Sequence, residues 1–172
     1  MPGPKPGYYI ITALRGDGGT VGVPIPTDTS KPLPQAEPIA IVPNDPRQRW
    51  EVFRTPQGGT CISPLSSVYL YSGAQDDNLV IATNNPAQNT EWEFMNFDRG
   101  NERPDVYAIF QRRGNWKAWA WTLDPEQDPE TQHASCCKNS EFSHITVEDL
   151  ELLPTSPPLG TDPQLFHFRR VD

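Results

Sequence analysis

Apolar and polar residues alternate along most of the chain, with the two-residue period of a half-buried β-strand. One phrase with this alternation occurs three times, as RQRWEVF (47–53), NTEWEFM (89–95) and QLFHFRR (164–170). In each phrase, a polar residue stands two places before a large aromatic residue, which is Trp50, Trp92 or Phe166. Such an internal repeat predicts three similar units, with the three aromatic residues at equivalent points around a pseudo-threefold axis.

Strand patterns cover most of the remaining chain, and clusters of Gly, Pro, Asn and Asp with turn chemistry separate them. The predicted strands are residues 8–14, 20–25, 38–42, 49–54, 60–65, 67–72, 79–83, 91–97, 105–112, 117–123, 144–153 and 165–171. Only residues 146–153 also have some helical character. Twelve strands in three groups of four predict an all-β fold, a β-trefoil, in which a closed barrel and a hairpin cap leave no exposed sheet edge. We expect one domain over residues 1–172, with repeats at about 7–56, 57–103 and 104–172.

The predicted core follows from the inward positions of these strands. It consists of Tyr9, Ile11, Val52, Val80, Phe94, Ile109, Trp119, Val147 and Phe168, together with Trp50, Trp92 and Phe166. Trp119 and Trp121 face the same side of their strand, and we expect that side to face the core because two large apolar groups in water would be costly.

The net charge of the chain argues against two classes of partner. The 172 residues carry a formal charge of −8 with only 14 basic residues, so we expect no nucleic acid and no anionic membrane as partner. No signal peptide is visible, and the three cysteines, Cys61, Cys136 and Cys137, do not form the even set of a secreted disulfide framework. This pattern favours a reduced, cytoplasmic protein.

Catalytic motifs are missing from the sequence. There is no Gly-x-Ser-x-Gly elbow and no P-loop, so we expect a protein that is not an enzyme and needs no cofactor. His133, Cys136 and Cys137, with His144, could surround a metal ion, but adjacent cysteines point apart and zinc-knuckle spacing is absent. We therefore expect no metal site, and interpret Cys136 and Cys137 as loop thiols.

The repeated strand phrase resembles the Gln-x-Trp repeat of ricin-B-type β-trefoils. The whole chain resembles the fungal β-trefoil protease inhibitors, namely the mycospins, which act on serine proteases, and the related mycocypins, which act on papain-like proteases. The motifs behind this resemblance are GYYIITA, AEPIAI followed by RQRWEV, AWTLDPEQDPETQ, and LFHFRRVD at the end. The resemblance implies an inhibitor that inserts a rigid surface loop into a protease and serves in defence or in the control of proteolysis.

The favoured mechanism, by similarity to the mycospins, uses the connection between the second and third strands, at about residues 24–37, against a serine protease. Its proline residues stiffen it, which lowers the entropy lost on binding. The expected protease-binding residues are Pro26, Thr27, Asp28, Thr29, Ser30 and Lys31. Lys31 suits a trypsin-like pocket, but trypsin-like enzymes cut poorly before proline, and Pro32 follows it. Either another residue, small or acidic, is the anchor, or the target is not trypsin.

The alternative mechanism uses the turn after the first strand, formed by Arg15, Gly16, Asp17, Gly18 and Gly19. Glycine permits the backbone that such a turn requires, so the Arg-Gly-Asp tripeptide needs no adhesive role. By similarity to the mycocypins, Gly18 and Gly19 would enter the cleft of a papain-like cysteine protease, with residues 43–48 in support.

A third hypothesis is a ricin-B-like lectin that binds glycans. Trp116, Trp119 and Trp121 offer aromatic platforms in one hairpin, beside Asn115. Ricin-type sugar sites also have an early Asp and a late Asn or Gln in the repeat, and no two repeats here carry that pair in matching places. The lectin hypothesis is therefore weaker than the inhibitor hypothesis.

Overall fold

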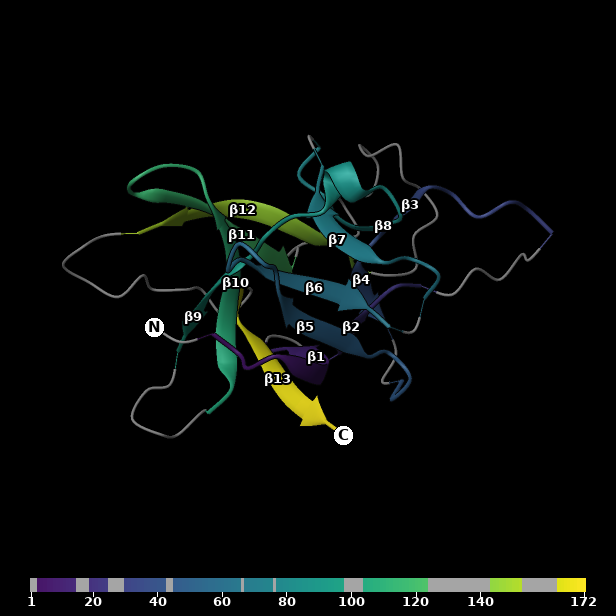
Figure 1. The fold of residues 1–172 in the computed structure, drawn as a ribbon, viewed down its shortest axis with the longest axis horizontal. Helices are drawn as coiled ribbons and strands as arrows, with labels where there is room; N and C mark the ends of the chain where they lie inside the picture. The colour runs from purple at the N-terminus through teal and green to yellow at the C-terminus, as the bar shows by residue number, and fades with distance from the viewer. Residues whose placement is uncertain are drawn as a thin grey trace, which may run out of the picture.

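A computed structural model describes residues 3–14, 19–24, 30–42, 45–65, 67–75, 77–97, 104–123, 143–152 and 164–172. These residues form strands and one 3-10 turn, η1 (Pro86–Gln88), with no α-helix among them (Figure 1). The strands are β1 (Gly7–Ala13), β2 (Thr20–Gly22), β3 (Ala36–Pro38), β4 (Ala40–Val42), β5 (Trp50–Arg54), β6 (Thr60–Pro64), β7 (Tyr71–Ala74), β8 (Val80–Thr83), β9 (Glu93–Asn96), β10 (Val106–Arg112), β11 (Lys117–Leu123), β12 (Ile145–Glu151) and β13 (Phe166–Val171). The predicted all-β class is confirmed.

Each of the twelve predicted segments contains a strand, with two differences in detail. The segment predicted at 38–42 is interrupted at Ile39, which separates β3 from β4. There the backbone N–H of Ile39 donates to Val80 O (2.8 Å), and Ile39 O accepts from Ile145 N (2.8 Å). Ile39 thus bonds to two other strands at once. The segment predicted at 67–72 becomes regular only at β7, four residues later.

Six strands form a nearly closed antiparallel barrel. β1 pairs with β5 and β13, β5 pairs with β6, and β10 pairs with β9 and β13. The remaining side of the ring lies between β6 and β9, where Trp92 N donates to Thr60 O (2.7 Å) just before β9 begins. Closure of this kind leaves little free strand edge on the barrel.

Three hairpins accompany the barrel, formed by β2 with β4, β7 with β8, and β11 with β12. They contact one another in pairs. β3 pairs with β8, Leu79 bridges to Thr146, and Ala40 bridges to His144. Each hairpin region therefore meets the other two.

An aromatic cluster of Trp50, Trp92, Trp121 and Phe166 lies at the centre of the core. Trp121 contacts the other three edge-to-face, with ring centroids at 6.4 Å from Trp50, 5.4 Å from Trp92 and 6.1 Å from Phe166. All four side chains are buried, so the burial predicted for the three repeated aromatic residues is confirmed. Of the predicted core residues, only Phe94 and Trp119 are half-buried, and both pack against this core.

The polar residue that precedes each repeated aromatic residue binds backbone or side-chain groups in or beside the hairpin strands. Gln48 Oε1 accepts from Val23 N (3.2 Å), and Gln48 Nε2 donates to Val23 O (3.3 Å). Thr90 N donates to Ser72 O (3.0 Å), and Gln164 Nε2 lies 3.4 Å from Thr122 Oγ1. Buried polar side chains need such partners, which explains the glutamines of the first and third repeats, whereas Thr90 makes this bond through its backbone.

Candidate functional site

The described half of the predicted protease-binding loop is a projecting segment, residues 30–35, in which every residue is exposed. Figure 1 shows this segment leading into β3 and extending beyond the other labelled elements. Pro32 and Pro34 restrict the backbone on both sides of Leu33. Ser30 and Lys31 lie at its start, whereas Pro26, Thr27, Asp28 and Thr29 lie outside the described residues.

The projecting segment is fixed to the β7–β8 hairpin region at its C-terminal end, the loop stem (Pro34 and Gln35). Tyr69 donates its phenolic hydroxyl to Pro34 O (2.9 Å), and Asn84 N donates to Gln35 O (3.4 Å). Immediately after the loop stem, β3 pairs with β8. Tyr69 and Asn84 flank β7 and β8, so the second group of strands holds a loop of the first group.

Tyr69 is only 3% exposed and belongs to the main core. Burial raises the pKa of its phenol, and the negative charge of Glu37 raises it further. The phenol therefore stays protonated at neutral pH, as a hydrogen-bond donor must.

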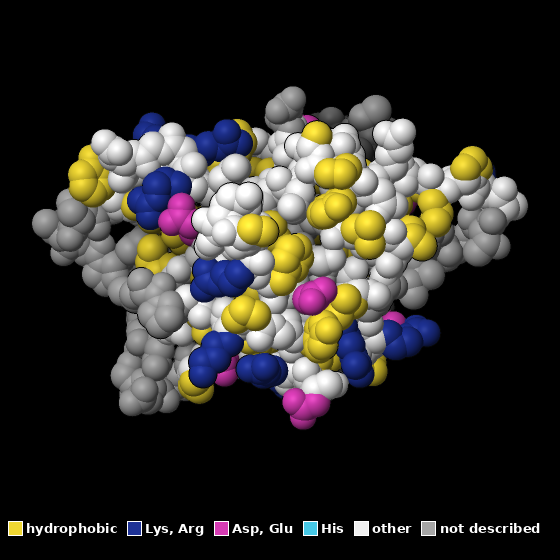
Figure 2. Space-filling model, in the orientation of Figure 1, with side chains coloured by type: hydrophobic (Ala, Val, Ile, Leu, Met, Phe, Trp, Pro, Cys, Tyr) yellow, Lys and Arg dark blue, Asp and Glu magenta, His cyan; other side chains and the backbone are white. Residues whose placement is uncertain are grey.

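Exposed apolar side chains flank Tyr69. Six large ones are exposed in the described part of the chain, namely Tyr8, Leu33, Leu65, Val68, Leu70 and Trp116. Val68 and Leu70 are the chain neighbours of Tyr69, and strand-like alternation turns them outward while Tyr69 turns inward. Figure 2 shows that hydrophobic side chains gather on the half of the face over β6 and β7, whereas most Lys and Arg lie on the half over β9, β10 and β13.

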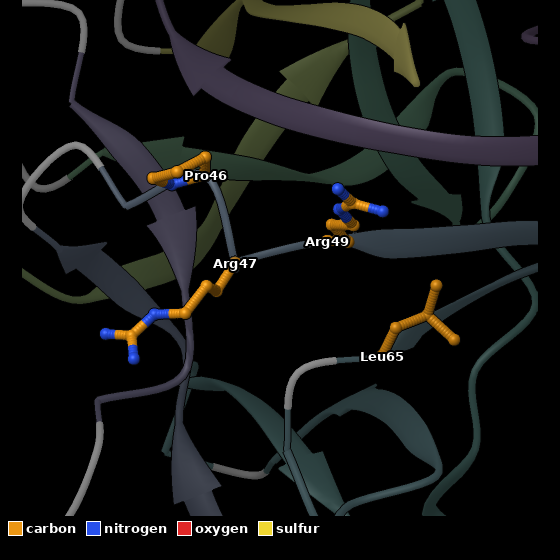
Figure 3. Close-up of a pocket in the computed structure, with 4 residues that line it drawn as sticks. All are labelled: Pro46, Arg47, Arg49 and Leu65. Carbon is orange, nitrogen blue, oxygen red and sulfur yellow. The ribbon is translucent and has the colours of Figure 1, made fainter. Parts of the chain in front are cut away.

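An open depression lies where β5 begins and β6 ends, and it is lined by Pro46, Arg47, Arg49 and Leu65 (Figure 3). Leu65 N donates to Arg49 O (2.8 Å), which joins its two sides. Arg47 points away from Arg49 and bonds to both carboxylate oxygens of Asp45 (2.9 and 2.8 Å). These bonds lower the pKa of Asp45. Pro46 and Arg47 of the predicted supporting loop thus line a cationic and apolar hollow, and residues 43–44 of that loop lie outside the described residues.

The alternative wedge loop is described only at Gly19, because Arg15, Gly16, Asp17 and Gly18 lie outside the described residues. Gly19 O accepts from Ala13 N (3.1 Å). A β-carbon at this position would overlap Cγ2 of Ile41 in β4. Close packing against β4 is therefore a sufficient reason for glycine at position 19.

The three tryptophan residues of the lectin hypothesis have different environments. Trp121 is buried in the aromatic cluster, and Trp119 lies under the guanidinium of Arg113, 3.8 Å from its ring centroid. Trp116 is 55% exposed in the turn between β10 and β11, where Asn115 is also exposed. Only Trp116 thus offers an open ring face to a ligand.

Of the residues considered for metal binding, the structure describes only His144. His133, Cys136 and Cys137 lie outside the described residues, and His144 is half-buried beside Ala40. The described residues contain no group of three or more metal-binding side chains, and none of their helices has the length and apolar character to cross a membrane. Cys61 is buried and forms no disulfide.

Neither a protein-family model nor a curated protein matches this sequence. A solved structure does match, a proteinase inhibitor from Coprinopsis cinerea, with a TM-score of 0.67 and 19% sequence identity. The alignment covers 98% of this chain and 99% of the other. The two proteins share one fold. That match agrees with the all-β class predicted from the strand pattern, at an identity too low to carry individual residues from one chain to the other.

Sequence reasoning missed Tyr69 and its exposed neighbours. The alternation of Val68, Tyr69 and Leu70 was the available signal, because it predicts an inward tyrosine between two outward apolar residues. Its hydrogen-bond partner, Pro34, lies 35 residues earlier and had no signal in the sequence.

Proposed function

We propose that this protein is a protease inhibitor that is not itself an enzyme, and that it binds a serine protease through the loop at about residues 24–37. The observation that carries the proposal is the match in fold, over nearly the full length of both chains, to a proteinase inhibitor. The projecting segment supplies an exposed surface that a protease can contact.

The fold proposed for this function is a β-trefoil. Six barrel strands, three hairpins that meet in pairs, and three repeated aromatic residues around Trp121 support it. On this proposal, residues 1–172 form one domain with repeats at about 7–56, 57–103 and 104–172. A barrel of this kind is a rigid support for loops that recognise a partner.

The proposed inhibitory loop combines exposure with restraint. Pro32 and Pro34 limit its backbone, and two hydrogen bonds attach the loop stem to the second group of strands. A loop that is already ordered loses less entropy when it enters an active site. Because Pro32 follows Lys31, we favour one of residues 27–30 as the residue that enters the specificity pocket of the protease.

The test is a panel of inhibition assays with trypsin, chymotrypsin, a subtilisin, papain and legumain. We expect inhibition of a serine protease, and a loss of at least tenfold when residues 27–31 are replaced by glycine and serine. The control is a glycine and serine replacement of Pro56 and Gln57, two exposed residues in the turn between β5 and β6. Full inhibition by the first variant would overturn the proposed loop.

Other outcomes separate the alternatives. Inhibition of papain alone would favour Gly18 and Gly19 as a wedge. Binding to a glycan array without any inhibition would favour the lectin, and Trp116→Ala should then abolish it. The cytoplasmic location that we propose from the cysteine pattern is tested by localising the tagged protein in its native cells.

A further inference from the structure

Two buried tyrosines in this fold donate their hydroxyl groups to backbone carbonyls of proline-containing segments. Tyr69, 3% exposed, donates to Pro34 O (2.9 Å), and Tyr9, 5% exposed, donates to Lys5 O (2.7 Å). The two bonds are alike in chemistry and burial. They differ in the segment that they fix. The Tyr9 bond fixes residues near the start of the chain, at Lys5, and the Tyr69 bond fixes the projecting segment, at Pro34.

The loop stem has few other bonds of comparable length to the second group of strands. Pro34 has no backbone N–H, so its carbonyl is its only backbone hydrogen-bonding group. Gln35 O accepts from Asn84 N at the longer distance of 3.4 Å. Thr83 Oγ1 also lies 3.4 Å from Gln35 O, but its single proton is directed to Gln88 Oε1 at 2.8 Å. The bond from Tyr69 is thus the shortest of these links.

We infer that Tyr69 is a positioning residue for inhibition, because its hydroxyl holds the projecting segment in the extended shape that a protease binds. The inference rests on the proposed function and adds a residue to it. Tyr69 reaches the segment from the core, with its ring packed among core side chains. The Tyr69 hydrogen bond thereby joins the main core to the projecting segment one residue beyond the bond from Asn84 and the pairing of β3 with β8.

The expected consequence is a loss of inhibition without a loss of fold. Removal of the hydroxyl keeps the packed ring but frees Pro34 O, so the segment samples more conformations. A net hydrogen bond of this kind corresponds to a change of about three- to tenfold in an equilibrium constant. A looser loop should also be cut and released faster by the protease that it inhibits.

The test compares Tyr69→Phe with the matched control Tyr9→Phe. Inhibition constants and loop cleavage rates are measured with the protease that the wild-type protein inhibits. Backbone order parameters at Leu33 and Gln35, from 15N relaxation, report on the loop without any protease. We expect Tyr69→Phe to raise the inhibition constant about three- to tenfold, to speed cleavage and to lower both order parameters, whereas Tyr9→Phe should match the wild type in all three.

Two negative results can be told apart. If the wild type inhibits and Tyr69→Phe inhibits equally well, the positioning role is overturned while the proposed function stands. If the wild type inhibits no protease of the panel, the proposed function is overturned and the positioning role with it. Equal losses in both variants would also overturn the inference, since they would reflect general destabilisation.

Discussion

The aromatic cluster and the projecting segment are held in opposite ways. In the cluster, three groups of strands each contribute an aromatic residue to one centre, Trp121, at similar distances and in the same edge-to-face geometry. At the projecting segment, one carbonyl, Pro34 O, depends on one hydroxyl from Tyr69. Repeated contacts of one kind stabilise the interior, whereas a few individual hydrogen bonds position the loop stem.

This difference separates stability from recognition. Burial of large aromatic side chains contributes several kcal/mol each, while one hydrogen bond contributes about 1 kcal/mol net. Changes at the projecting segment should therefore alter binding at little cost to folding. Changes in the cluster should do the reverse and lower the amount of folded protein.

The largest expected effect is that of Trp92→Ala. Trp92 is buried, contacts Trp121 at 5.4 Å, and donates its indole N–H to Ser72 Oγ (3.1 Å). We expect a loss of about 3–5 kcal/mol in the free energy of unfolding, measured by urea denaturation. The matched control is Trp116→Ala, because Trp116 is 55% exposed and should cost at most about 0.5 kcal/mol. Similar costs for the two variants would contradict the central position of the cluster.

The repeated phrase allowed most of this interior to be predicted. Strand alternation places Trp50, Trp92 and Phe166 inward, and their burial follows. It could not single out Trp121, because Trp119 has the same orientation in the same strand; only the assembled fold buries Trp121 in the aromatic cluster and leaves Trp119 half-buried under Arg113. Contacts between distant segments, such as that of Tyr69 with Pro34, depend on the assembled fold and leave no period in the sequence.

The next largest expected effect is that of Gln48→Ala. Its side chain satisfies both the N–H and the C=O of Val23 in a buried setting. Loss of the side-chain amide leaves the N–H and C=O of Val23 without this hydrogen-bond partner, which should lower the free energy of unfolding by about 1–3 kcal/mol. Gln57→Ala, at an exposed turn, is the matched control and should leave the urea midpoint unchanged. If Gln48→Ala left the free energy of unfolding unchanged, the polar residue of the repeated phrase would not be needed to stabilise the interior.

Alkaline pH should weaken the main core and the loop stem through buried tyrosines. Burial is the main cause that raises the pKa of Tyr9, Tyr69 and Tyr107 above the ordinary value of 10.0. The stability that their protonated forms contribute is complete below pH 10 and is lost as pH rises through the raised values. We expect urea midpoints to be flat, as far as these groups are concerned, from pH 8 to 10 and to fall above it. The fall should be smaller in Tyr69→Phe, and an equal fall would argue against ionisation of Tyr69.

The smallest expected effects belong to the exposed end of β10, where two neighbouring arginines act by different physics. Arg112 forms an ion pair with Glu93 (3.1 Å), and both side chains are about half exposed, so Arg112→Ala should cost at most about 0.5 kcal/mol and nothing in high salt. Arg113 covers the ring of Trp119 at 3.8 Å, so Arg113→Ala should cost about 0.5–1 kcal/mol. Because that contact also excludes water from the ring, its cost should persist in 0.5 M salt. Urea denaturation in low salt and in 0.5 M salt distinguishes the two variants. If the cost of Arg113→Ala disappeared in 0.5 M salt, the contact with Trp119 would be mainly electrostatic and not apolar packing.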